Sequence, residues 1–271
     1  MKSVYKKRIV ITGSSGLLGK YFSKKFKKKY IIYKYPYRIE NIKKFTKWIS
    51  RKNFEYFIHF AAKTKGNTKK LNRINSIASI NIIKHLSKKK SLKYFLFIST
   101  SHVYRYSKTK ISEKQKPKPI NNYGLSKKRV EDFIIQNKKS FKFKIGIARI
   151  FNITGPKQRE SYFVPDMYKL IKKKNFIDNV NSYRDFIHID DVMDSINILI
   201  MKKFDLIINI CSGQKINLIS VCKTINSIYF NKNLVFGKKR GKDLYGDNKL
   251  LKSLGKRKFK DIYQIIRSFK K

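Results

Sequence analysis

The chain has 271 residues, 41% of them hydrophobic, with 66 lysines and arginines against 16 aspartates and glutamates. This length allows one main domain with a smaller lobe around a cleft. Two cysteines are too few for a disulfide framework. They have no histidines at ligand spacing, so there is no reason to expect a metal site. No secretory leader or membrane-spanning stretch is recognisable, so we expect a cytoplasmic protein.

The formal net charge of +50 is the most unusual feature of the composition. Such a charge is typical of proteins that bind nucleic acid or other polyanions. The lysines are spread through almost every segment, however, which favours a solvated basic surface over a dedicated nucleic-acid site. In either case the positive field attracts phosphate-rich ligands, and it does so more weakly as salt rises.

Short apolar runs alternate with longer amphipathic segments along the whole chain. Strands are expected at 8–12, 30–33, 56–60, 94–99, 145–150 and 206–210, and helices at 18–29, 41–52, 70–90, 124–138, 164–174, 190–202 and 217–229. Strands that are covered by helices on both faces read as continuous apolar runs, as these do. The alternation therefore predicts an α/β fold with a doubly wound parallel sheet.

Three glycines, Gly13, Gly16 and Gly19, lie between the first expected strand and the first expected helix. In a dinucleotide-binding loop the first glycine allows the tight turn, the second lets the backbone approach a pyrophosphate, and the third permits close packing of helix on strand. The strand before the loop and the helix after it are the context that this motif requires. The segment, with Ser15 and Leu17 in the same turn, predicts a Rossmann-type dinucleotide site.

The motif T-G-x-x-G-x-x-G resembles the start of the extended short-chain dehydrogenase/reductases, which include the NAD-dependent epimerases and dehydratases of nucleotide-linked sugars. Further matching segments occur in the family's order: Phe57–Ala62, Asn75–Asn81, Phe97–Tyr104, Tyr123–Lys127, Arg149–Pro156, Arg184–Asp191 and Asn209–Gly213. We therefore expect residues 1–155 to form the dinucleotide-binding domain, with 185–215 returning to it. Residues 156–271 would form mainly a smaller, interleaved substrate lobe.

Tyr123 and Lys127 are the expected catalytic pair, although Tyr-x-x-x-Lys spacing recurs by chance in a chain so rich in both residues. Tyr123 opens a helix shortly after the strand that ends at Thr100, and ligands bind at the carboxyl ends of such strands. On a helix Tyr123 and Lys127 share a face, and a nearby ammonium favours the phenolate form. We expect Tyr123 to exchange a proton with a sugar hydroxyl. The resemblance implies that Lys127 also holds the nicotinamide ribose and that Thr100 hydrogen-bonds the reacting oxygen.

Thr100 is followed by Ser101 and His102, where the sugar 4,6-dehydratases of the resembled family carry an Asp-Glu pair. Dehydration needs an acid and a base at these positions, so that reaction is disfavoured. His102 lies where enzymes similar to GDP-fucose synthase carry a cysteine that moves protons. A histidine can transfer protons near neutral pH, but a packed or solvated side chain is the alternative, and both interpretations stay open.

NADP(H) is favoured over NAD(H) by the segment after the second strand. It contains Lys34 and Arg38 and has no acidic residue before Glu40. NAD-specific sites usually place a carboxylate there to bind the ribose 2′-hydroxyl, whereas basic residues accommodate a 2′-phosphate. The resemblance implies that Ala61 and Ala62 also line the dinucleotide site.

In the second half of the chain, the resemblance implies three contacts with the substrate. Asn152 would donate to its diphosphate, Arg184 would border its pocket, and Arg240 would clamp its pyrophosphate by paired hydrogen bonds. Asp190 and Asp191 are better explained as residues that begin and cap the next helix.

Together these features predict an NAD(P)-dependent nucleotide-sugar epimerase or 4-keto-sugar reductase, which the resemblance associates with polysaccharide biosynthesis and with a homodimer. A nucleoside diphosphate sugar is the expected substrate. One alternative is a carbonyl reductase that acts on a non-nucleotide substrate. The other is a non-catalytic Rossmann module that binds nucleic acid through its basic surface.

Overall fold

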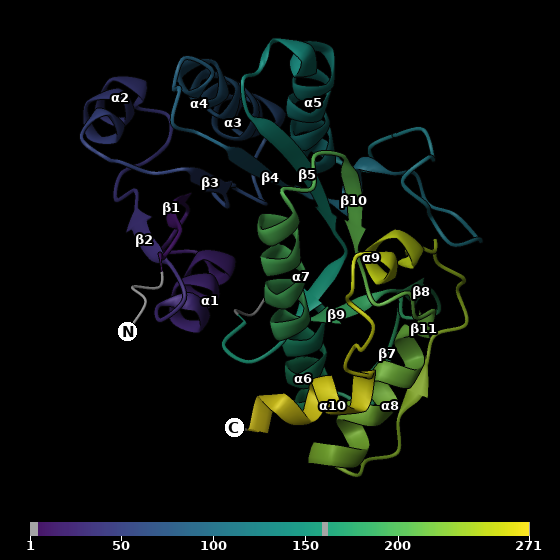
Figure 1. Ribbon diagram of the computed structural model, residues 1–271. Helices are drawn as coiled ribbons and strands as arrows, with labels where there is room; N and C mark the ends of the chain where they lie inside the picture. Colours follow the sequence, from purple (N-terminus) through teal and green to yellow (C-terminus); the bar gives the residue numbers. More distant parts are fainter. Residues whose placement is uncertain (1–4, 159–161, 271) are drawn as a thin grey trace. The chain divides into compact units, whose positions relative to one another are not determined.

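Six strands form one sheet in the order β10-β5-β4-β3-β1-β2 in the computed structural model, which describes residues 5–158 and 162–270 (Figure 1). They are β1 (Arg8–Thr12), β2 (Ile31–Lys34), β3 (Tyr56–His59), β4 (Tyr94–Thr100), β5 (Lys144–Ile150) and β10 (Ile207–Ile210). These are the six predicted strands, and each end lies within one residue of its expected place. β1 pairs in parallel with β2 and β3, and β3 pairs in parallel with β4. The predicted Rossmann-type α/β fold is confirmed.

The order in which strands are added reverses at β1. β2 lies on one side of β1 and β3 on the other, and β4, β5 and β10 extend the sheet from β3. In open sheets of this kind ligands bind outside the carboxyl ends of the strands at the point of reversal. The residues directly after β1 and β3, which begin at Gly13 and Phe60, therefore border the expected ligand position.

The predicted helices are present, and two short ones near the C-terminus were not expected. The bounds are α1 (Leu17–Phe26), α2 (Ile42–Ser50), α3 (Thr68–Leu71), α4 (Ala78–Leu86), α5 (Asn122–Asn137), α6 (Phe163–Lys173), α7 (Ile189–Lys202), α8 (Leu218–Tyr229), α9 (Lys249–Ser253) and α10 (Ile262–Arg267). The single helix predicted over 70–90 is divided, because a π-helical turn, Asn72–Ile77, separates α3 from α4. In the described part of the chain, no helix combines the length and the apolar character needed to cross a bilayer.

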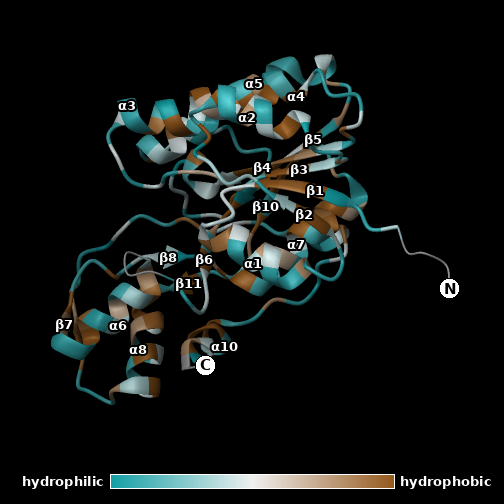
Figure 2. Cartoon of the chain, turned by 90° about the vertical axis from the view of Figure 1, so that its left-hand side faces the viewer, coloured by the Kyte–Doolittle hydropathy of each residue, from teal (hydrophilic) through white to brown (hydrophobic). Residues whose placement is uncertain are grey.

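Helices α2, α4 and α5 cover one face of the sheet, and α1 lies on the other (Figure 2). On the first face Phe45, Ile82 and Val130 pack in one cluster with Phe57 and Phe95 of the central strands. Every residue of β3 and β4 is buried. Burial on both faces explains why these strands consist mainly of apolar residues.

A second compact unit comprises Arg105–Gln115, Ile150–Ser195 and Asn209–Lys271. It holds three short strand pairs: β6 (Asn152–Thr154) with β9 (Phe186–His188), β8 (Tyr183–Arg184) with β11 (Ile216–Asn217), and β7 (Phe176–Ile177) with β12 (Val235–Phe236). Buried side chains of α6, α8 and α10, among them Ile171, Val221 and Ile265, form its own core.

The two units divide the chain differently from the predicted domains. The first unit comprises Met1–Tyr104, Lys116–Arg149 and Ile196–Ile208, so the returning segment is shorter than the expected 185–215. The segment 105–115, expected in the first domain, joins the second unit, because the backbone N–H of Ser107 donates to the carbonyl of Asp243 and Ile111 pairs with Gly246. Pairing between residues so far apart in the chain leaves no periodic signal in the sequence.

Candidate active site

The turn after β1 requires glycine at two of its three glycine positions. Gly13 has φ +68°, and a Cβ there would lie 2.6 Å from the backbone nitrogen of Ala61. A Cβ on Gly19 would lie 2.3 Å from the carbonyl oxygen of Gly13. These two positions give a tight turn and close packing of α1 on the strand. Gly16 is less crowded, since the nearest atom to its Cβ would be the Gly13 oxygen at 3.3 Å.

The N-terminus of α1 suits an anionic ligand. Gly16 is the N-cap residue and supplies no side chain to the first N–H groups, and the first turn of α1 contains no acidic residue. Ser15 and Gly16 are exposed, and Leu17 is half-buried. A helix N-terminus carries partial positive charge and donor N–H groups, which together favour phosphate. The loop therefore fits the pyrophosphate of a dinucleotide.

Several basic side chains follow strands β2 and β3. Lys34, the last residue of β2, and Arg38 are both exposed. The pKa of Lys63 is lowered, first by its contact with Lys70 and also by the charge of Arg38, while Glu40 acts in the opposite direction. Arg38 and Lys70 are thus both close enough to act on Lys63. A 2′-phosphate would relieve their mutual repulsion.

The other predicted cofactor contacts follow β3. Ala61 is half-buried and Ala62 is exposed. The backbone N–H of Ala61 donates to Oγ1 of Thr12, 3.3 Å away, which ties the segment after β3 to the end of β1. The two segments that flank the sheet's point of reversal are therefore held together.

Asn75 connects this region to α5, and its role was not predicted. It is fully buried in the π-helical turn. Its amide accepts from the backbone N–H of Lys63 at 2.8 Å, donates to the Lys63 carbonyl at 2.8 Å, and donates to Ser126 Oγ at 3.0 Å. Ser126 in turn donates to the carbonyl of Tyr123. A π-turn is a common device at functional sites, and here it places one amide between the loop after β3 and the start of α5.

Thr100, His102, Tyr123 and Lys127 all belong to the first unit. Thr100 ends β4, is buried, and accepts from the backbone N–H of His102 at 3.3 Å. The His102 and Tyr123 rings meet edge to face, with centroids 6.0 Å apart. A Cβ on Gly124 would lie 2.1 Å from the carbonyl oxygen of His102, so α5 packs directly on the turn that follows β4. The structure thus brings His102 beside Tyr123.

Lys127 is buried, with 1% of its surface exposed. Its Nζ donates to the carbonyl of Ile98 at 2.7 Å and lies 4.5 Å from the centroid of the Phe97 ring. Burial lowers the pKa of Lys127 to about 7, while the carboxylate of Glu131 acts to raise it. The ammonium is therefore held at the carboxyl end of β4 and loses its proton more readily than an exposed lysine.

Lys127 is expected to make the free energy of unfolding rise with pH above neutrality. Its pKa is about 7 in the folded chain, against 10.5 for an ordinary lysine. Between these values the unfolded chain holds a proton that the folded chain has released, so stability increases with pH by at most about 1.4 kcal/mol per unit. Urea unfolding from about pH 7 to about pH 9 measures the slope. The slope should be smaller in Lys127→Met, and an equal slope in both proteins would contradict the assignment.

A buried ion pair supports this end of β4. Arg149 and Glu131 are each 1% exposed, and Arg149 Nη2 lies 2.5 Å from Glu131 Oε2. Ser99 Oγ donates to the same carboxylate at 2.5 Å, and the Arg149 guanidinium lies 4.7 Å from the Tyr104 ring centroid. Glu131 is one helical turn after Lys127 and was not singled out from the sequence. The spacing K-x-x-x-E was the available signal, hidden by the abundance of lysine.

The three predicted substrate residues lie in the second unit. The Asn152 amide donates to the carbonyl of Asp185 at 2.8 Å. The Arg184 guanidinium donates to the carbonyls of Tyr183 and Lys242. Arg240 pairs with Asp243 at 2.6 Å, although its side chain is 47% exposed. Each of these groups thus has contacts within the chain.

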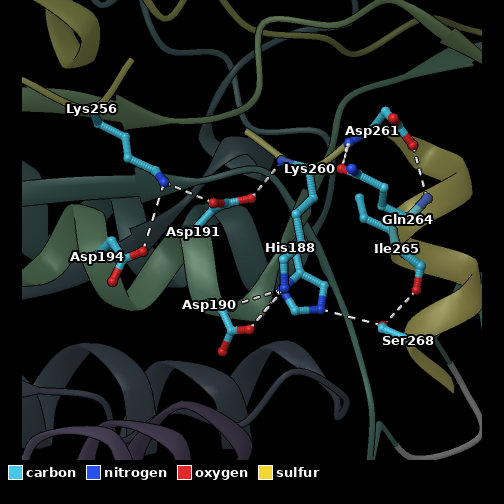
Figure 3. Close-up of polar contacts among 10 residues, drawn as sticks. All are labelled: His188, Asp190, Asp191, Asp194, Lys256, Lys260, Asp261, Gln264, Ile265 and Ser268. Carbon is cyan, nitrogen blue, oxygen red and sulfur yellow. Dashed lines mark hydrogen bonds and ion pairs between the residues drawn. The ribbon is translucent and has the colours of Figure 1, made fainter. Parts of the chain in front are cut away.

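Asp190 and Asp191 do not cap α7 but lie within its first turn (Figure 3). Asp191 accepts from Lys256 Nζ at 2.7 Å and from the backbone N–H of Lys260, whose Nζ lies 2.9 Å from Asp190. Acidic residues here favour the helix N-terminus, but their main contacts tie down the segment between α9 and α10. No sequence pattern links these residues, which lie some 65 to 70 positions apart.

An open hollow of about 650 Å³ lies beside these contacts. It is lined by Asp191, Ser212, Gly213, Gln214, Lys252, Lys256, Arg257, Lys258, Phe259, Lys260 and Gln264. The residues that the sequence identified for catalysis and for binding do not line it. Within 5–158 and 162–270, no three of His, Cys, Asp and Glu are grouped as metal ligands would be.

Comparison with known proteins agrees with this geometry. Residues 9–211 match the model of the NAD dependent epimerase/dehydratase family. The chain is 30% identical over 221 residues to a GDP-6-deoxy-D-talose 4-dehydrogenase of Aggregatibacter actinomycetemcomitans, a match that covers 76% of this chain and 74% of that protein. It is 27% identical to a dTDP-D-glucose 4,6-dehydratase of Dictyostelium discoideum, covering 82% of this chain and 62% of that protein.

Among solved structures, the chain is similar to the RMD protein of Pseudomonas aeruginosa complexed with NADPH. The TM-score is 0.85 at 22% identity, and the match covers 97% of each chain. At this identity the likeness shows the fold. The family match covers most of the chain, and the predicted resemblance is confirmed. The chain belongs to the NAD-dependent epimerase/dehydratase family and is an NAD(P)-dependent enzyme of the extended short-chain dehydrogenase/reductase type.

Proposed function

We propose that the chain interconverts a hydroxyl and a keto group on the sugar ring of a nucleoside diphosphate sugar, most simply as a 4-keto-sugar reductase. The observation that carries this proposal is the set of Thr100, Tyr123 and Lys127 at the carboxyl end of β4, with Ser101 and His102 where a dehydratase needs two carboxyl groups. The 30% identical relative is named for a 4-dehydrogenase reaction on a GDP-linked 6-deoxy sugar, which supports the same chemistry.

The chain's residues have distinct parts in this proposal. Nicotinamide, when bound, supplies or accepts the hydride at the sugar carbon. Tyr123 gives a proton to the carbonyl oxygen as the ketone becomes a hydroxyl, and takes it back in the reverse direction. Lys127 places positive charge near the phenol in its protonated form, which predominates below its pKa of about 7. Thr100 orients the reacting oxygen by a hydrogen bond. Asn152, Arg184 and Arg240 are proposed to contact the substrate, with Arg240 exchanging part of its contact with Asp243 for a phosphate.

Epimerisation is the second candidate, favoured by the family to which the chain belongs. Both reactions use the same tyrosine, and they differ in whether the dinucleotide is consumed. Incubation with UDP-, GDP-, dTDP- and CDP-linked sugars and 4-keto sugars, with and without NADPH, separates them by product mass. A gain of two hydrogens coupled to loss of NADPH indicates reduction, and a product of unchanged mass indicates epimerisation. If no nucleotide-linked sugar reacts while a simple carbonyl compound does, the proposal fails.

NADP(H) is the proposed dinucleotide. Arg38 lies just after β2, and its charge acts on Lys63. Replacing Arg38 by glutamine should weaken NADPH binding by about 10- to 100-fold, the effect of losing one charge-assisted hydrogen bond. NADH lacks the 2′-phosphate, so its affinity should change little.

Titration calorimetry with both dinucleotides checks this preference. Lys47→Gln is the matched control, because Lys47 is exposed on α2 and its loss removes the same charge from the same unit. If Lys47→Gln loses as much NADPH affinity as Arg38→Gln, the loss comes from the overall positive charge of the chain, which is +50, and not from a contact made by Arg38. Tighter binding of NADH than NADPH by the unmodified chain would refute the proposed preference.

A further inference from the structure

His102 is held between the end of β4 and the start of α5. It lies in the 3₁₀ turn Ser101–Val103, and its carbonyl accepts from the backbone N–H of Ile120 at 3.1 Å. Its ring lies edge to face against Tyr123. Its Nδ1 lies 3.0 Å from Nδ2 of Asn121, the N-cap residue of α5. Asn121 therefore contacts the imidazole and the helix at the same time.

The helix cap determines which way the Asn121 amide points. Its Oδ1 lies 2.8 Å from the backbone nitrogen of Gly124. A backbone N–H can only donate, so the carbonyl oxygen must face Gly124 and the NH₂ group must face His102. The NH₂ group can only donate as well, so Nδ1 of His102 must be the acceptor. A neutral imidazole with an unprotonated Nδ1 carries its proton on Nε2.

We propose that Asn121 is a positioning residue that fixes His102 as the neutral tautomer with the proton on Nε2. An imidazolium ring, or the other tautomer, would set an N–H on Nδ1 against the N–H of the Asn121 amide. The Asn121 amide makes both the helix cap and the contact with the ring. The hydrogen bond that caps α5 therefore also determines the tautomer of His102.

This inference deepens the proposed function, on which its chemical consequence rests. Nε2–H donates a hydrogen bond to an oxygen, but it does not accept a proton while Nδ1 is engaged by Asn121. Epimerisation at a carbon next to the keto group requires a base that removes the C–H proton there. His102 in the fixed tautomer is not that base. It acts on a substrate oxygen beside Tyr123, as suits hydride transfer to a ketone without exchange at the neighbouring carbons.

Two substitutions at one position separate this role from the helix cap. Aspartate caps a helix as well as asparagine does, but Asn121→Asp turns an acceptor oxygen toward Nδ1 and draws a proton to it. Asn121→Ser keeps an oxygen for the Gly124 N–H and is too short to reach the ring. Asn41→Asp is the matched control, because Asn41 caps α2 by the same hydrogen bond to the third residue after it, its Oδ1 lying 3.0 Å from the Lys44 nitrogen.

The direct readout is the ¹⁵N spectrum of the histidine ring nitrogens in the full chain, with His102→Gln used to assign the signals. The unmodified protein and Asn41→Asp should show His102 with Nδ1 unprotonated and Nε2 protonated. Asn121→Asp should protonate Nδ1, and Asn121→Ser should give a mixture of the two tautomers. A protonated Nδ1 in the unmodified protein, or the same pattern in all three Asn121 forms, would overturn the inference.

The consequence is read in D₂O with a keto sugar that the substrate panel identifies. The product made by the unmodified protein should carry no deuterium at the carbons next to the former carbonyl, and deuterium should appear there in Asn121→Asp. Deuterium in the product of the unmodified protein would overturn the assignment of His102 as a fixed donor. Failure of every sugar in the panel would refute the proposed function, whereas the ¹⁵N spectra report the tautomer without any substrate.

Discussion

Replacing Tyr123 by phenylalanine is expected to lower kcat by about 10²- to 10⁴-fold, the range that a positioned general acid or base contributes. Phenylalanine keeps the ring that meets His102 edge to face and removes only the hydroxyl. The phenol that supplies the proton accompanying hydride transfer is then missing. Single-turnover loss of NADPH absorbance, with the sugar identified by the panel, measures the effect.

The control uses a second Tyr-x-x-x-Lys spacing in the same chain. Tyr168 and Lys172 lie on α6 at that spacing, and Tyr168 is 37% exposed. Tyr168→Phe should leave kcat unchanged, and both variants should bind NADPH as the unmodified chain does. A Tyr123→Phe protein with normal kcat would remove the phenol from the proposed mechanism.

Breaking the buried pair of Glu131 and Arg149 should have the largest effect on stability. Removing one partner leaves an uncompensated charge in a site where both side chains are 1% exposed, at a cost of about 3–5 kcal/mol. Glu131→Gln and Arg149→Met should each lower the free energy of unfolding by this amount. The double variant Glu131→Leu/Arg149→Met removes both charges and should recover most of the loss. Urea unfolding at neutral pH measures all three.

An exposed pair on the same helix serves as the comparison. Lys128 and Asp132 are one turn apart on α5, with side chains 27% and 42% exposed. Lys128→Gln should cost at most about 1 kcal/mol, because water screens such a pair. If Glu131→Gln lowers the free energy of unfolding no more than Lys128→Gln does, the pair of Glu131 and Arg149 does not stabilise the end of β4.

The fold was predictable because its signals are local. The central strands β3 and β4 are short runs buried on both faces, so most of their residues are apolar. The glycine loop is local as well. Gly13 needs a positive φ and Gly19 a close approach of helix to strand, and both requirements appear within seven residues of sequence.

The contacts that organise the candidate site were less accessible, because each joins residues far apart in the chain. Asn75 contacts Ser126, 51 positions later in the chain. Asn75 lies in a π-turn, whereas the sequence pattern predicts one continuous helix there. Glu131 meets Arg149 across 18 positions, from a helix to the next strand. In a chain with 66 lysines and arginines, a single acidic residue near a basic one carries little information.

The pair formed by Asn121 and His102 shows the same limit at shorter range. Asn121 was not singled out from the sequence. Nothing in its spacing indicates that its amide caps α5 on one side and meets the His102 ring on the other. Asp190 and Asp191 were assigned to a helix cap for a similar reason, since their lysine partners lie in the C-terminal segment. The homodimer stays a prediction from the family resemblance.

Titration calorimetry of NADPH into the unmodified chain and into Gly13→Val tests the central claim most directly. The glycine loop and the Tyr123 end of α5 are taken to hold one nicotinamide dinucleotide. A side chain at Gly13 would meet the Ala61 backbone at 2.6 Å and distort the loop. The account predicts one dinucleotide bound per chain and loss of that binding in Gly13→Val. Absence of binding to the unmodified chain, or unchanged binding to the variant, would contradict it.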